Sequence, residues 1–225
     1  MVECRFQVDM QALQGKVERM ETNWATEHLQ VIRTLMERSA VYRRALAPVM
    51  TLTGVLGLAA ALGGWLGKVA SPRAFVVYWL LVSLAAIIGA FLLVRRQALK
   101  ENEPFWSPPT RRVTQASLPP LSAGLILTVI ALIAGGVDLG LLTVGWIILY
   151  GCALHAAGFF MPRGMKIFGW AFVLGGCVLA AIAGKFAWRG PLYLYAHGMM
   201  GLFFGALHLA YGVYLYFTER GKNAA

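Results

Sequence analysis

The residues of this chain best suited to chemistry are three histidines and a cysteine that lie within strongly apolar stretches. Cys152 and His155 lie three positions apart in "YGCALHAAG", and His197 and His208 lie in "YAHGMMGLFFGALHLAYG". Neutral imidazoles can serve as axial ligands of haem iron, and ionisable side chains in apolar segments are candidates for function. We therefore take Cys152, His155, His197 and His208 as the candidate polar site.

Glycines accompany these histidines at helical spacing. At about 100° per residue, His197 and His208 fall on one helical stripe with three glycines, and two more glycines flank His155. Small residues let helices approach closely. We predict that these glycines pack against neighbouring helices: Gly151, Gly158, Gly201, Gly205 and Gly212.

Three interpretations of the histidines stay open. In the first, each imidazole is neutral and hydrogen-bonds within a tight helix crossing, and no cofactor is present. In the second, His155 and His208 ligate haem b. We place these two histidines at comparable depths, about 21 and 26 Å from the outer ends of their helices, and His197 at about 9 Å. In the third, His155, His208 and Cys152 line a polar path or a small-solute pocket.

The elements that must position these residues follow from the composition. The chain has 225 residues, of which 59% are hydrophobic and 13% charged, and its mean hydropathy is +0.65. An ordinary soluble domain has about 45–50% apolar and about 25% charged residues. A soluble fold is therefore excluded, because so few charges cannot cover so much apolar surface.

Six apolar runs are long enough to cross a hydrocarbon layer of about 30 Å. None of them contains Asp, Glu, Lys or Arg, and they do not alternate as barrel strands would. The sequence thus predicts an all-α polytopic membrane protein with a six-helix transmembrane domain over residues 46–218. The predicted spans are 47–66, 75–94, 121–137, 141–161, 167–184 and 191–217.

The basic residues predict the orientation. Sixteen of the 20 Lys and Arg residues lie on the side that holds both termini, and only Lys68, Arg73, Lys185 and Arg189 lie opposite. The positive-inside rule then places both termini in the cytoplasm and the chain in the cytoplasmic (inner) membrane. The net charge of +10 is read as this topology signal and as attraction to anionic headgroups, not as a nucleic-acid site.

Residues 1–45 are predicted to form a cytoplasmic helical arm. Apolar residues recur there first as a coiled-coil seam of two heptads and then as a shifted helical stripe. Such an amphipathic helix can lie on headgroups, cover the bundle, or dock a protein partner or a second copy of the chain. The arm stripe consists of Met10, Leu13, Val17, Met20, Trp24, Ile32, Leu35 and Tyr42.

Two cytoplasmic segments complete the predicted organisation. Residues 95–120 hold five prolines, so we expect an extended linker there instead of a continuous helix. Residues 219–225 form a short tail.

The chain has no zinc-protease motif, nucleophile elbow, P-loop or dinucleotide fingerprint, so we expect no enzyme activity and no bound metal. The leading functional hypothesis is a non-enzymatic scaffold or regulatory membrane subunit, with haem-based electron transfer and small-solute transport as alternatives.

Overall fold

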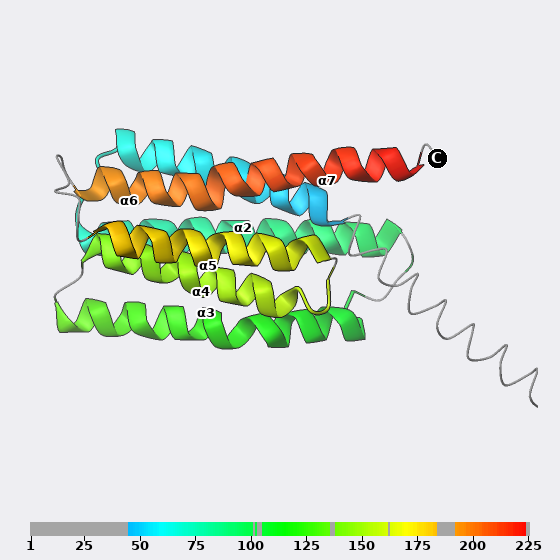
Figure 1. The fold of residues 1–225 in the computed structure, drawn as a ribbon, viewed down its shortest axis with the longest axis horizontal. Helices are drawn as coiled ribbons and strands as arrows, with labels where there is room; N and C mark the ends of the chain where they lie inside the picture. Colours follow the sequence, from blue (N-terminus) through cyan, green and yellow to red (C-terminus); the bar gives the residue numbers. More distant parts are fainter. Residues whose placement is uncertain are drawn as a thin grey trace, which may run out of the picture. The chain divides into compact units, whose positions relative to one another are not determined.

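The fold is described from a computed structural model, and the description covers residues 45–100, 102, 105–135, 138–161, 163–183 and 192–223. These residues all belong to one compact unit of the chain, residues 41–225. They form helices joined by short connections, and the described part of the chain has no strand (Figure 1).

Six of the helical segments are long and apolar enough to cross a membrane, which confirms the predicted all-α architecture. Each overlaps one predicted span. The first span is Ala45–Leu66, and it is followed by α2 (Pro72–Lys100), α3 (Pro108–Ala134), α4 (Leu139–Ala157) and α5 (Arg163–Ala183). The last span is one continuous helical segment made of α6 (Leu192–Met200), the π-helix η1 (Gly201–Leu207) and α7 (His208–Asn223).

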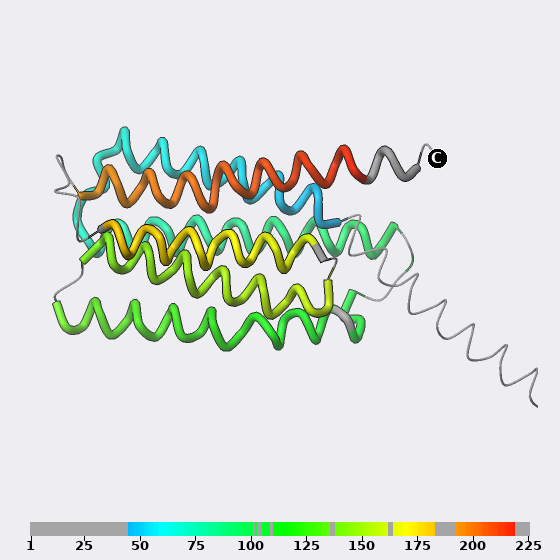
Figure 2. The backbone as a smooth tube through the Cα atoms, viewed as in Figure 1, coloured from blue at the N-terminus to red at the C-terminus, as the bar shows by residue number. Residues whose placement is uncertain are grey.

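Successive spans run in opposite directions, so their connections alternate between the two ends of the bundle (Figure 2). One end, which we call the basic end, holds the start of the first span, the α2–α3 and α4–α5 connections and the end of α7. At the opposite end, Asp138 caps α4, because its Oδ1 accepts hydrogen bonds from the backbone N–H groups of Gly140 (2.8 Å) and Leu141 (3.0 Å).

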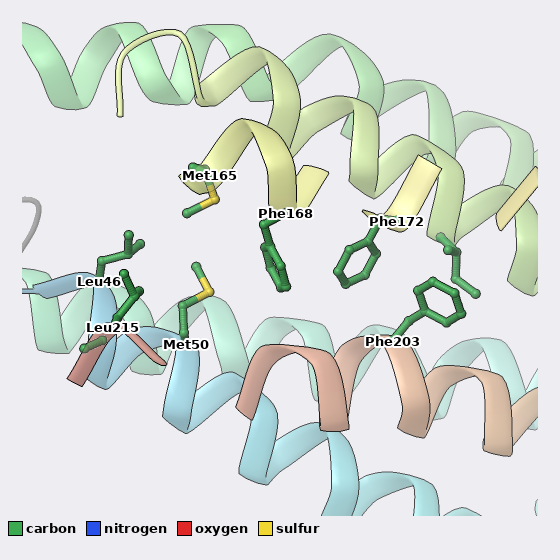
Figure 3. Packing of buried hydrophobic residues seen from close by; sticks show 9 residues of the cluster. Leu46, Met50, Met165, Phe168, Phe172, Phe203 and Leu215 are labelled. Carbon is green, nitrogen blue, oxygen red and sulfur yellow. The ribbon is translucent and has the colours of Figure 1, made fainter. Parts of the chain in front are cut away.

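The core consists of two clusters of buried apolar side chains. The cluster nearer the basic end joins the first span, α4, α5 and the last span, and Figure 3 shows Phe168 and Phe172 of α5 pointing towards Met50 and Phe203. The second cluster lies nearer the opposite end. It contains Ala60, Phe75, Trp79, Leu139, Ala196 and Met200.

The prediction of an extended linker over residues 95–120 is wrong. Helix α2 continues to Lys100, and α3 begins at Pro108, so only about seven residues connect them. Pro108 and Pro109 start α3, where the missing N–H of proline costs nothing. Pro119 and Pro120, which we expected in the extended linker, lie inside α3, and each removes a single backbone hydrogen bond from a helix of 27 residues.

Helices α2 and α3 are the most exposed spans. Only 11% of the apolar window of each is buried inside the bundle, against 28–44% for the other four. Helix α3 contacts chiefly α4, where the Trp146 indole N–H donates to the Thr128 hydroxyl at 2.8 Å. The outward faces of both helices are lined by leucine, isoleucine and valine. Such faces are suited to lipid, which is the environment that six apolar helices require.

Candidate functional site

His197 lies on α6 and is fully buried, with both ring nitrogens engaged. Its Nδ1 accepts a hydrogen bond from the Trp79 indole Nε1 at 3.1 Å, and its Nε2 lies 3.1 Å from the carbonyl oxygen of Val69. An indole N–H can only donate and a carbonyl can only accept. Nδ1 therefore carries no proton and Nε2–H donates to Val69, so His197 is a neutral imidazole that ties α6 to α2 and to the loop after the first span.

An aromatic and glycine-lined enclosure holds this ring. Phe75, Tyr78 and Tyr193 contact it with ring centroids 4.9, 5.9 and 6.5 Å away. A Cβ atom on Gly64 of the first span would overlap the imidazole. Only glycine at position 64 therefore leaves room for His197, and the surrounding rings keep the imidazole in one place.

His208, the first residue of α7, is also fully buried and engaged at both nitrogens. Its Nδ1 lies 3.0 Å from the carbonyl oxygen of Phe203, and its Nε2 lies 2.9 Å from the Tyr150 hydroxyl of α4. Because the carbonyl can only accept, Nδ1–H is the donor, and the Tyr150 hydroxyl donates to Nε2. His208 is therefore the opposite tautomer of His197.

The π-helix η1 directly precedes His208 and explains its unusual bond. The accepting carbonyl of Phe203 lies five residues before His208, inside the seven-residue π-helical segment Gly201–Leu207. Short π-helical stretches within α-helices are rare and are frequent at functional sites. The imidazole takes up this carbonyl and contacts the rings of Phe168 and Phe172 of α5, with centroids 5.1 and 5.3 Å away.

His155 differs from the other two histidines. It is half-buried on α4, and its Nδ1 is a buried nitrogen with no hydrogen-bond partner among the described residues. The ring contacts Phe159 and Trp170 edge-on, with both centroids 5.4 Å away. Cys152 is half-buried one turn earlier and is a free thiol. Within the described segments, no group of three or more His, Cys, Asp or Glu side chains could hold a metal ion.

The structure does not bring His155 and His208 together. His208 contacts Phe168 of α5 and His155 contacts Trp170 of the same helix. Two residues along a helix differ by about 200°, so the two histidines lie against opposite faces of α5. Both nitrogens of His208 also have protein partners. These residues therefore do not fit a haem held between His155 and His208.

Three of the five candidate glycines lie on the last span against the first span. A Cβ atom on Gly201 would lie 2.7 Å from Cβ of Ala61, one on Gly205 2.8 Å from the backbone nitrogen of Leu58, and one on Gly212 2.7 Å from that of Thr51. The first span contributes a glycine to the same contact, since a Cβ atom on Gly57 would overlap the carbonyl of Phe204. The two helices thus pack antiparallel, nearly backbone to backbone.

The other two candidate glycines lie between α4 and α5. A Cβ atom on Gly151 would lie 2.8 Å from the backbone nitrogen of Val173, and one on Gly158 2.9 Å from that of Lys166. From the α5 side, a Cβ atom on Gly169 would lie 2.6 Å from the backbone nitrogen of His155. This second close pair fixes His155 on α4 relative to α5.

Sequence reasoning missed the partners of the histidines. Trp79 and Tyr150 were not among the candidates, and their bonds to His197 and His208 join residues far apart in the sequence. The available signal was their position, because both lie inside predicted spans, where a buried indole N–H or phenol hydroxyl needs a partner. The arm stripe, Met10, Leu13, Val17, Met20, Trp24, Ile32, Leu35 and Tyr42, lies outside the described residues.

Comparison with known proteins finds no match: no family model, no curated protein and no solved structure matches this chain. The class of the protein therefore rests on the helices themselves. Six apolar helices of spanning length make it a multi-pass membrane protein with buried, hydrogen-bonded histidines in the last span.

Proposed function

We propose that this protein is a non-enzymatic scaffold or regulatory subunit of the cytoplasmic membrane. In this proposal the six-helix bundle anchors the N-terminal arm, residues 1–45, and the arm docks a partner protein or a second copy of the chain. One observation carries the proposal for the bundle. All four ring nitrogens of His197 and His208 are bound by other groups of the same chain. Histidines bonded in this way hold helices together, and this favours a structural role for the bundle.

The close glycine contacts support the same role. Gly57 and Gly205 place the first and last spans nearly backbone to backbone, and Gly151 and Gly169 do the same for α4 and α5. Such contacts are lost when helices separate. A bundle held at both pairs is suited to anchoring a segment attached to the first span.

The charge distribution supports the proposed orientation. The described basic end carries Arg95, Arg96, Lys100, Arg111 and Arg112 on α2 and α3. The positive-inside rule places that end, and with it both termini, in the cytoplasm. A protease-protection assay with a tag at either terminus tests this orientation. Each tag should be digested in sealed inside-out vesicles of the inner membrane, which expose the cytoplasmic face. Digestion of a tag from the external face of intact cells contradicts the proposed orientation.

Matched variants of the arm test the docking role. Leu13→Glu with Val17→Glu places two negative charges on the arm stripe, and Gln11→Glu with Gln14→Glu places the same two charges beside it. Buried charges disrupt a helix interface, whereas exposed ones do not. We expect the stripe variant to lose at least tenfold in recovery of the partner or of a differently tagged second copy from purified membranes, with insertion unchanged.

The control variant should recover the partner as the unaltered chain does. Equal recovery by the stripe variant, or by a chain lacking residues 1–44, contradicts the proposal. Both variants are first compared for membrane insertion and detergent stability, so that loss of docking is separated from loss of the bundle.

A further inference from the structure

The last turns of α2 and the first turn of α3, on either side of their connection, carry a set of basic side chains, which we call the basic patch: Arg95, Arg96, Lys100, Arg111 and Arg112. We propose that the basic patch binds the phosphate headgroups of anionic phospholipids in the adjoining leaflet, while their acyl chains lie along α2 and α3. This inference is independent of the docking role proposed for the arm.

Contacts in the turn bring the two halves of the basic patch together. The Phe105 ring packs on Phe91 of α2, with ring centroids 4.8 Å apart, and the Phe105 carbonyl accepts a hydrogen bond from the Thr110 hydroxyl of α3 at 3.1 Å. Arg95 lies one helical turn beyond Phe91 on the same face, and Arg111 follows Thr110. Phe105 therefore holds the first turn of α3 beside the end of α2, with arginines on both.

The five side chains of the basic patch are exposed and have no ion-pair partner within the described segments. Residues 95–112 also include Glu101 and Glu103, so five basic and two acidic residues leave a net charge of +3. Guanidinium groups bind phosphate oxygens in a bidentate manner. The charge complementarity therefore points to an anion that carries phosphate.

The apolar surroundings identify that anion as a lipid. Leu99 is 69% exposed and Trp106 is 60% exposed, both within a few residues of the patch. Tryptophan prefers the headgroup level of a membrane. The exposed faces of α2 and α3 continue from this point as leucine, isoleucine and valine. A phospholipid satisfies both parts of this surface, because its headgroup meets the arginines and its chains cover the apolar faces.

Trp106 provides a local probe for the test. The full chain is reconstituted in phosphatidylcholine vesicles containing increasing fractions of brominated phosphatidylglycerol or brominated phosphatidylcholine, which quench nearby tryptophan. The difference between the chain and its Trp106→Phe variant isolates the emission of Trp106. We expect brominated phosphatidylglycerol to quench Trp106 at a several-fold lower fraction than brominated phosphatidylcholine.

Charge-matched variants locate the effect. Arg95→Gln with Arg111→Gln should reduce the preference for phosphatidylglycerol by about fivefold or abolish it. Lys68→Gln with Arg73→Gln removes two charges at the opposite end and should leave the preference unchanged. Quenching by brominated phosphatidylcholine reports insertion for each variant, and Arg96→Gln with Arg112→Gln replaces the first variant if it does not insert. Equal quenching by the two lipids in the unaltered chain, or an equal loss in the control, overturns the proposal.

Discussion

The indole of Trp79 and the imidazole of His197, 118 positions apart in the sequence, are joined by a buried hydrogen bond of 3.1 Å. The bond fixes the imidazole tautomer, because the indole can only donate. It also ties the second span to the last one, near the end of the bundle opposite the basic end. There the Nε2–H of His197 also donates to the carbonyl of Val69. The Trp79 and His197 rings are both buried within the bundle, so water cannot readily replace the bond between them.

Trp79→Phe should destabilise the bundle by about 1–2 kcal/mol, because it removes the donor and leaves Nδ1 of His197 buried without a partner. The measurement is the denaturation midpoint of the purified protein in mixed detergent micelles of increasing dodecyl sulfate content. Trp170→Phe is the control, since Trp170 is 49% exposed and lies against the half-buried His155. A larger loss for Trp170→Phe than for Trp79→Phe would contradict the proposed bond.

Tyr150→Phe and Tyr211→Phe remove the same hydroxyl from two sites with different partners. The Tyr150 hydroxyl donates to Nε2 of His208, whereas the Tyr211 hydroxyl is buried with no partner among the described residues. We expect Tyr150→Phe to lower stability by about 1–2 kcal/mol, because an acceptor is left unpaired. Tyr211→Phe should leave stability unchanged or raise it, because an unpaired polar group is removed.

The same denaturation assay compares the two tyrosine variants under identical conditions. A Tyr211→Phe variant that is less stable than the Tyr150→Phe variant would contradict this assignment. The double variant measures how strongly the two sites are coupled, because Phe168 contacts both Tyr211 and His208, the partner of Tyr150.

Gly57→Ala should separate the first and last spans. Its new methyl group would overlap the Phe204 carbonyl, and backbone cannot move aside as a side chain can. We expect a loss of about 1–3 kcal/mol. Gly145→Ala on α4 is the matched control, because nothing lies within 4 Å of a Cβ atom there, and the better helix propensity of alanine should leave stability unchanged or raise it by up to about 1 kcal/mol. Equal effects of the two substitutions would show that the close approach at Gly57 is not required.

Nitrogen NMR of protein labelled with ¹⁵N-histidine should resolve two opposite neutral tautomers. His197 should carry its proton on Nε2 and His208 on Nδ1, as their partners demand. Spectra of the Trp79→Phe and Tyr150→Phe variants assign the signals, because each substitution should shift the resonances of one histidine. A single common tautomer for both residues contradicts the hydrogen-bond assignment.

The helices could be predicted from the sequence, but their partners could not. Apolar runs without charges identify spans because lipid leaves helices as the available structure, and this signal is local. The pairing of Gly57 with Gly205 or of Tyr150 with His208 depends on side-chain fit between distant segments, for which no local periodicity exists. The placement of Pro119 and Pro120 inside α3 also escaped prediction, because the loss of one backbone bond at each position is tolerated in a long helix.

The antiparallel packing of the first and last spans has a consequence for biosynthesis. Leu66 ends the first span and Leu192 begins the last, so about 125 residues must be added before the glycine face around Gly57 can meet its partner. At common rates of translation this takes roughly 6 to 25 s. During that interval the glycine face of the first span lacks the helix against which it packs in the completed bundle.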